Sequence, residues 1–211
     1  MGNIMSIVLQ GSTSGSVTLQ EPAVAGTTVL DLPAVSGTIL TTGSSGQSIP
    51  KAALPTGSVL QVVSTTKTDT FSSTASSFTD VTGLSVSITP TSVTSKIFVI
   101  LSIAGVNADT TGSTARVARN GTGIGVATSA GSRNAGGTGE MYSTVAGSVF
   151  LTYISTVLDS PATTSAITYS GQIIAGSGGS YTTYINRSSA DGNNNTYSRG
   201  ASSITVMEIA G

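Results

Sequence analysis

The stretch Leu84-Ser85-Val86-Ser87-Ile88 is the clearest indicator of the fold class of this chain. Its apolar residues alternate with serines, which is the period-2 pattern of a strand with one buried face. Further strand-type runs follow at short spacing, and the full set is 59–64, 84–89, 96–106, 114–119, 124–128, 148–158, 166–175, 181–186 and 204–209. Turn residues separate the runs, including Asn120-Gly121, a pair typical of two-residue hairpins. We therefore predict an all-β chain with an antiparallel β-sandwich or jelly roll.

The first fifty residues contain an internal repeat. Gly15, Gly26 and Gly37 are spaced eleven residues apart, and Pro-Ala-Val recurs at 22–24 and 33–35. Each unit offers a short apolar strand, a proline that cannot donate to a ladder and a glycine that can turn. Such a unit cannot bury its apolar face alone, so we expect it to need a neighbouring chain or a docking surface. The residues expected to make these assembly contacts are Val17, Leu19, Pro22, Val24, Val29, Leu32, Pro33, Val35 and Ile39.

Two prolines, Pro50 and Pro55, interrupt any regular pattern after the repeat. The sequence therefore predicts two parts, an extended N-terminal arm over residues 1–57 and a β domain over residues 58–211. An unstructured polar leader is the alternative for the first part.

The composition weighs against catalysis. The chain has no histidine, cysteine or tryptophan, and serine with threonine makes up nearly a third of its 211 residues. Histidine is the usual general base and metal ligand near neutral pH, and cysteine supplies thiolate nucleophiles. We therefore expect a non-enzymatic protein that binds no cofactor and no metal ion.

Charge also restricts the partners. Eight basic and nine acidic residues give a net charge of −1, and the basic residues form no stripe of the kind that nucleic-acid binding requires. No run reaches 18 apolar residues, so membrane insertion is not expected. A chain this neutral resists association poorly, which favours a place in an oligomer or particle.

Three candidate sites in the sequence also have simpler explanations. Ser48 and Lys51 have the spacing of a Ser-Lys hydrolase, but Pro50 breaks the helix that this motif requires. Paired carboxylates would suit a polysaccharide depolymerase, yet the acids are isolated in the sequence and fall where turns are expected. Asp191-Gly-Asn-Asn-Asn195 alternates oxygen ligands as a calcium loop does, but Ser202 stands where the bidentate glutamate belongs, and an Asn-rich turn is the simpler interpretation.

A group of tyrosines and arginines near the C-terminus is the candidate contact surface. Tyr181, Tyr184, Arg187 and Tyr197 lie among several asparagines, a mixture that suits sugar or protein surfaces through stacking and adaptable hydrogen bonds. Structural tyrosines at the ends of a sheet or at a subunit interface explain the same pattern.

Several segments of the sequence resemble segments of known proteins. Residues 55–69 (PTGSVLQVVSTTKTD), 78–90 (FTDVTGLSVSITP), 95–99 (SKIFV) and 203–210 (SITVMEIA) resemble a domain in structural proteins of tailed phages, notably marine and cyanobacterial ones. The Pro-Ala-Val-x-Gly-Thr units of the arm are similar to segments of phage tail-fibre chains. The Arg119-Asn-Gly hairpin and the final strand also resemble the trimeric jelly rolls of the tumour-necrosis-factor and complement type, at the level of fold only.

The resemblance implies a virion protein that is made in the host cytoplasm. We expect a short tail-fibre or adhesin protein, a homotrimer whose arm binds other virion proteins and whose domain contacts a host glycan or envelope protein. A capsid decoration or head-fibre protein that stabilises the shell is the alternative, and a depolymerase is a third.

Overall fold

The computed structural model of the chain describes residues 6–10, 13–14, 16–20, 51, 54–107, 112–137, 140–141, 151–176 and 181–211. Their regular structure is all β, and the described part of the chain contains no α-helix. The strands are β1 (Ser6–Gln10), β2 (Ser16–Gln20), β3 (Val59–Lys67), β4 (Phe71–Ser73), β5 (Thr79–Ile88), β6 (Lys96–Asn107), β7 (Ser113–Arg119), β8 (Thr122–Ile124), β9 (Glu140–Met141), β10 (Leu151–Asp159), β11 (Ile167–Ile174), β12 (Thr183–Ile185) and β13 (Ser202–Ile209).

The chain divides into two compact units, residues 1–48 and 49–211. In the first unit β1 pairs antiparallel with β2, with Leu9 opposite Val17 and Ile7 opposite Leu19. Of the expected arm contacts, Val17 and Leu19 lie on β2, and the others fall outside the described residues. The predicted boundary after residue 57 stays a prediction.

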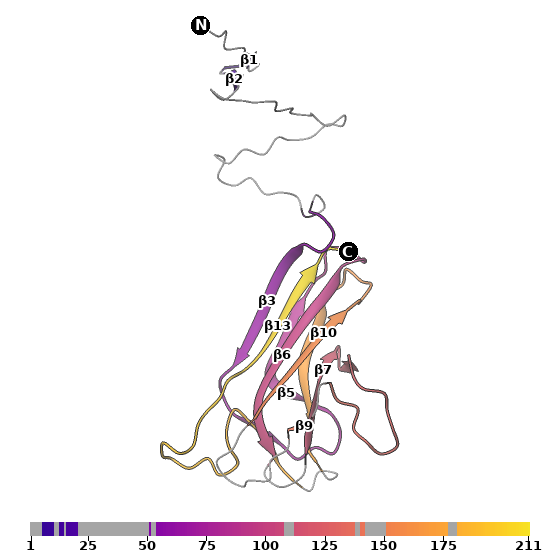
Figure 1. The fold of residues 1–211 in the computed structure, drawn as a ribbon, viewed down its shortest axis with the longest axis vertical. Helices are drawn as coiled ribbons and strands as arrows, with labels where there is room; N and C mark the ends of the chain where they lie inside the picture. The colour runs from indigo at the N-terminus through magenta and orange to yellow at the C-terminus, as the bar shows by residue number, and fades with distance from the viewer. Residues whose placement is uncertain are drawn as a thin grey trace, which may run out of the picture. The chain divides into compact units, whose positions relative to one another are not determined.

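The second unit contains two packed sheets (Figure 1). In the first sheet, β6 is central: β13 and then β3 lie on one side of it, and β10 lies on the other. The last residues of β6 pair with β12, which pairs with β4, so these two short strands extend the same sheet. All of these pairings are antiparallel.

The second sheet has the order β5–β11–β7, and β8 and β9 pair with successive parts of β7. The tight turn between β7 and β8 is the predicted Asn-Gly hairpin. Asn120 and Gly121 have φ values of 48° and 83°, which are the left-handed conformations of a type I′ turn. This part of the sequence prediction is confirmed.

Alternation along the strands explains the core. Leu84, Val86 and Ile88 are buried on β5, while the serines between them are exposed. Strand β6, in the first sheet, buries Ile97, Val99, Leu101 and Ile103 in the same way. Apolar residues from both sheets therefore form a single core, as expected for a sandwich.

The predicted fold class, an all-β chain with an antiparallel sandwich, is confirmed. One strand prediction is wrong: β8 ends at Ile124, whereas a strand was predicted over 124–128. Gly125 has φ of 58°, so the backbone leaves the extended conformation directly after Ile124. The short strands β4 and β9 were not predicted, because three and two residues carry no readable periodicity.

Candidate functional site

The candidate contact residues lie in the connection from β12 to β13, which we call the 186–201 loop. Ser202 of β13 pairs with Lys67 at the end of β3, and Ile209 pairs with Val59 at its start. The loop therefore lies at the Lys67 end of the sandwich, and the chain enters β3 at the opposite end (Figure 1). The length of β3 separates the two ends, roughly 25 to 30 Å at the usual rise of a strand.

Asn186 fixes the base of the loop. It is fully buried with a φ of 61°, a conformation that asparagine tolerates better than most residues. Its side-chain amide donates to the carbonyl oxygens of Lys67 and Asp69, both at 2.9 Å, and its carbonyl oxygen accepts from Ser202 Oγ at 2.6 Å. The start of the loop is thus held to the end of β3 and to the start of β13.

Charged groups hold the middle of the loop together. Asp191 accepts from Arg199 at 2.8 Å and lies 3.5 Å from Arg187. The Arg187 guanidinium stacks over the Tyr184 ring at 4.3 Å and donates to the carbonyl oxygens of Ser188 and Ser189. Arg187 therefore contacts Tyr184 and is bonded within the loop.

Tyr197 borders an open hollow of about 530 Å³. The residues that line it are Asp191, Gly192, Asn193, Asn194, Asn195, Tyr197 and Arg199. A Cβ atom at position 192 would collide with the Tyr197 ring, so glycine lets the backbone come close to this ring. The hollow offers one aromatic ring, amides that both donate and accept, a carboxylate and a guanidinium.

Of the four predicted contact residues, only Tyr197 lines this hollow. Tyr181 and Tyr184 are half-buried outside its lining. Residues 191–195 have the alternating oxygen ligands of a calcium loop. In the structure, however, the Asp191 carboxylate pairs with two arginines, Arg187 and Arg199. Among the described residues, no group of three His, Cys, Asp or Glu side chains could hold a metal ion.

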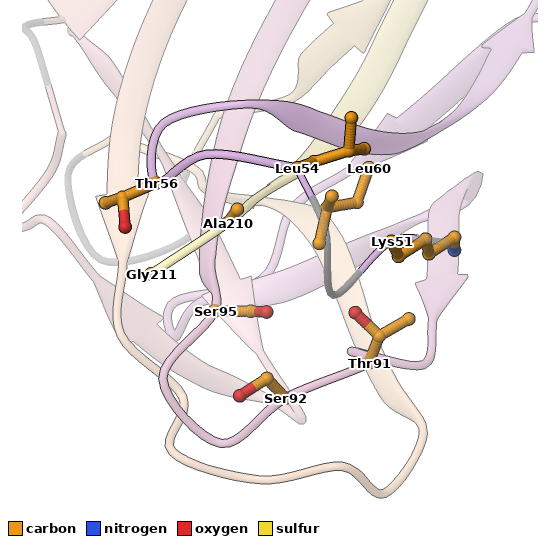
Figure 2. A pocket seen from close by; sticks show the side chains of 9 residues that line it. All are labelled: Lys51, Leu54, Thr56, Leu60, Thr91, Ser92, Ser95, Ala210 and Gly211. Carbon is orange, nitrogen blue, oxygen red and sulfur yellow. The ribbon is translucent and has the colours of Figure 1, made fainter. Parts of the chain in front are cut away.

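A second pocket, of about 390 Å³, lies at the other end of the sandwich (Figure 2). Lys51, Leu54 and Thr56 line it from the chain entering β3, and Leu60 lines it from β3 itself. The other lining residues are Thr91, Ser92, Ser95, Ala210 and Gly211. The Gly57 amide donates to the Ala210 carbonyl, and the Ala210 amide donates to the Ser58 carbonyl, both at 2.8 Å. The chain is therefore tied to the C-terminal strand before β3 begins.

Glu208 lies behind this second pocket and is fully buried. Its carboxylate accepts from the Thr91 amide at 2.6 Å, from the hydroxyls of Thr91 and Ser95 at 2.7 Å, and from Gln61 Nε2 at 2.6 Å. Burial acts to raise the pKa of Glu208, but these hydrogen bonds outweigh it and lower the pKa below its usual 4.5. The Ser95 hydroxyl donates its hydrogen to this carboxylate, so Ser95 helps to hold Glu208 in place.

Comparison with protein-family models and with curated proteins finds no match to this chain. The described residues include no helix long and apolar enough to cross a membrane.

Proposed function

We propose that the chain is a non-enzymatic structural protein of a tailed-phage virion, of the short tail-fibre or adhesin type. The observation that carries the proposal is the opposite placement of two features on one sandwich. The chain enters β3 at one end, and the 186–201 loop with its hollow lies at the other. A fibre protein needs this arrangement, because one end attaches to the particle while the other stays free to bind.

The hollow supports carbohydrate as the bound class. A sugar ring stacks its C–H face on an aromatic side chain and offers hydroxyls that donate and accept together. Tyr197 supplies the ring, the exposed Asn193 and Asn195 supply amides, and Arg199 supplies a donor. Asn186 holds the base of the loop in place, so little loop ordering is needed on binding.

Residues 1–57 are the assembly segment in this proposal. They bind other virion proteins, and the protein is made in the host cytoplasm before it joins the particle. Each repeated unit carries apolar residues that it cannot bury alone, which supports this role.

A glycan array probed with the full chain tests the proposal. We expect binding to a defined set of bacterial surface glycans, and a loss of about tenfold or more in affinity for Tyr197→Ala. The double variant Asn193→Ala/Asn195→Ala changes exposed amides only and should weaken binding as well. Arg133→Ala, at an exposed residue elsewhere, should bind as the unchanged protein does.

The proposed role fails if no glycan binds, or if Tyr197→Ala binds normally while retaining its thermal stability. Release of reducing sugar from a bound polysaccharide would make the chain a depolymerase. Immunogold labelling of virions that carry the protein would locate it on the particle. Gold on the tail is expected, and gold on the head would identify a capsid decoration protein.

A further inference from the structure

The outward face of the first sheet carries a row of apolar side chains across all four of its long strands. Leu158 of β10 pairs with Phe98 of β6, Phe98 pairs with Met207 of β13, and Met207 pairs with Val62 of β3. We call these four residues the outer row. The two at its ends are the most exposed, with 57% of Leu158 and 55% of Val62 accessible to solvent.

The positions around the outer row extend the apolar surface. Ile100 and Ile154 lie on one side of the row, and the paired residues Val59 and Ile209 lie on the other. Serines, threonines and Ala104 occupy most of the other outward positions of these strands, and Lys96, at the start of β6, is the one charged side chain among them. The apolar surface therefore lies towards the end of the face where β3 begins, and the whole face is nearly uncharged.

An antiparallel sheet with one solvated face normally presents polar residues on that face. Isolated exposed apolar residues are ordinary, but a contiguous patch over several strands indicates an interaction surface. The four strands are about 4.8 Å apart and the shared register runs for eight or nine residues, so the face measures roughly 600 Å² in projection. This approaches the roughly 800 Å² per partner of a stable interface.

We propose that a second copy of this chain packs against the outer row, face to face. A partner for this surface needs no complementary charge, because the surface has almost none, and the chain itself meets that condition with a net charge of −1. Two such faces present the same apolar patch and the same neighbouring hydroxyl groups, which allows self-complementary contact. The contact lies along the strands, so both ends of each sandwich stay accessible. The inference rests on the sandwich alone and holds whether or not the 186–201 loop binds carbohydrate.

Sedimentation of the full chain over a wide micromolar range tests this interface. We expect the unchanged protein to have at least twice the 20.8 kDa mass of one chain. Val62→Lys/Leu158→Lys should sediment as a single chain, with association weakened about a hundredfold or more, because four lysines would be buried unpaired in each contact. Both positions are exposed in the single chain, so its folding should be preserved.

Two further variants make the result specific. Val62→Thr/Leu158→Thr shortens the apolar surface without charge and should weaken association by a smaller factor. Thr82→Lys/Ser85→Lys adds the same two charges to exposed positions of β5 on the other sheet and should leave the mass unchanged. A single-chain mass for the unchanged protein, or an unchanged mass for both outer-row variants, overturns the proposal. Tyr197→Ala should leave the mass unchanged, which separates this interface from the glycan site.

Discussion

The outward faces of the two sheets differ in chemistry. On the second sheet, Asp80, Gln172 and Arg116 form a row across β5, β11 and β7, linked by hydrogen bonds of 3.0 and 2.9 Å. The Arg116 guanidinium lies 3.8 Å over the Phe78 ring. On the first sheet the comparable row is Leu158, Phe98, Met207 and Val62. On the second sheet the charged and amide side chains of this row thus bond to one another, while the row of the first sheet leaves apolar area exposed.

The inward face of the first sheet carries two acidic side chains, Asp159 and Glu208, where apolar side chains are usual. Next to the outer row, the inward row is Asp159, Ile97, Glu208 and Gln61. Asp159 reaches across the sandwich, where it accepts from Arg119 at 2.9 Å and from Tyr169 Oη at 2.7 Å. At this end of the sheet, acids point inward and hydrocarbons point outward, reversing the usual arrangement. The inward acids are tolerable because each has several donors.

The largest stability effect should come from the inward row. Glu208→Gln places an amide nitrogen where the carboxylate accepts from Gln61 and removes the charge that strengthens the other bonds. We expect the free energy of unfolding to fall by about 2 kcal/mol, measured by urea denaturation. A loss below about 0.5 kcal/mol would mean that the Glu208 network contributes little to stability.

The polar row of the second sheet should give a smaller effect. Gln172→Ala removes the link between Arg116 and Asp80, but both charged groups retain access to water. The expected loss is about 1 to 1.5 kcal/mol in the same denaturation experiment. Thr168→Ala, at an exposed position of the same strand, is the control and should change stability less. Equal losses in both variants would contradict a special role for the row.

The connection between the sheets is tested by Tyr169→Phe. Burial, followed by the hydrogen bond to Asp159, raises the pKa of Tyr169 well above its usual range, so its hydroxyl stays protonated and donates. Removing the hydroxyl should cost about 1 kcal/mol, because Arg119 still pairs with Asp159. In a protein that already carries Asp159→Asn, thermal unfolding should show a smaller cost of Tyr169→Phe if the two side chains act together. An equal cost in both backgrounds would show that they act independently.

The smallest effect should be that of pH near neutrality. With no histidine or cysteine, Tm should stay within about 3 °C between pH 5 and 9. Because the folded pKa of Glu208 is lowered, its contribution is complete above the unfolded pKa and is lost as pH falls through the folded value. Stability should therefore decrease below about pH 4.5, and less steeply in Glu208→Gln. A shift of many degrees inside the neutral window would reveal a carboxyl or lysine group with a strongly shifted pKa.

Much of the fold was predictable from alternation. Leu84, Val86 and Ile88 predicted a half-buried strand, and Asn120-Gly121 predicted a tight turn, because both signals depend only on neighbouring residues. The candidate site was predictable only in part. Tyr197 was selected together with Tyr181, Tyr184 and Arg187, yet only Tyr197 lines the hollow, since chain folding decides which loop residues share a surface.

By itself, the sequence determined the all-β class, the two-residue hairpin and the near absence of charge, all properties of composition and local periodicity. The pairing of β10, β6, β13 and β3 was decided by the tertiary structure alone. Leu158, Phe98, Met207 and Val62 are far apart in the chain, and each alone is an ordinary strand residue. Register between distant strands brings them into one row, and the burial of the opposite faces in a shared core selects that register. The same long-range pairing encloses Glu208 among Thr91, Ser95 and Gln61, which no local pattern indicates.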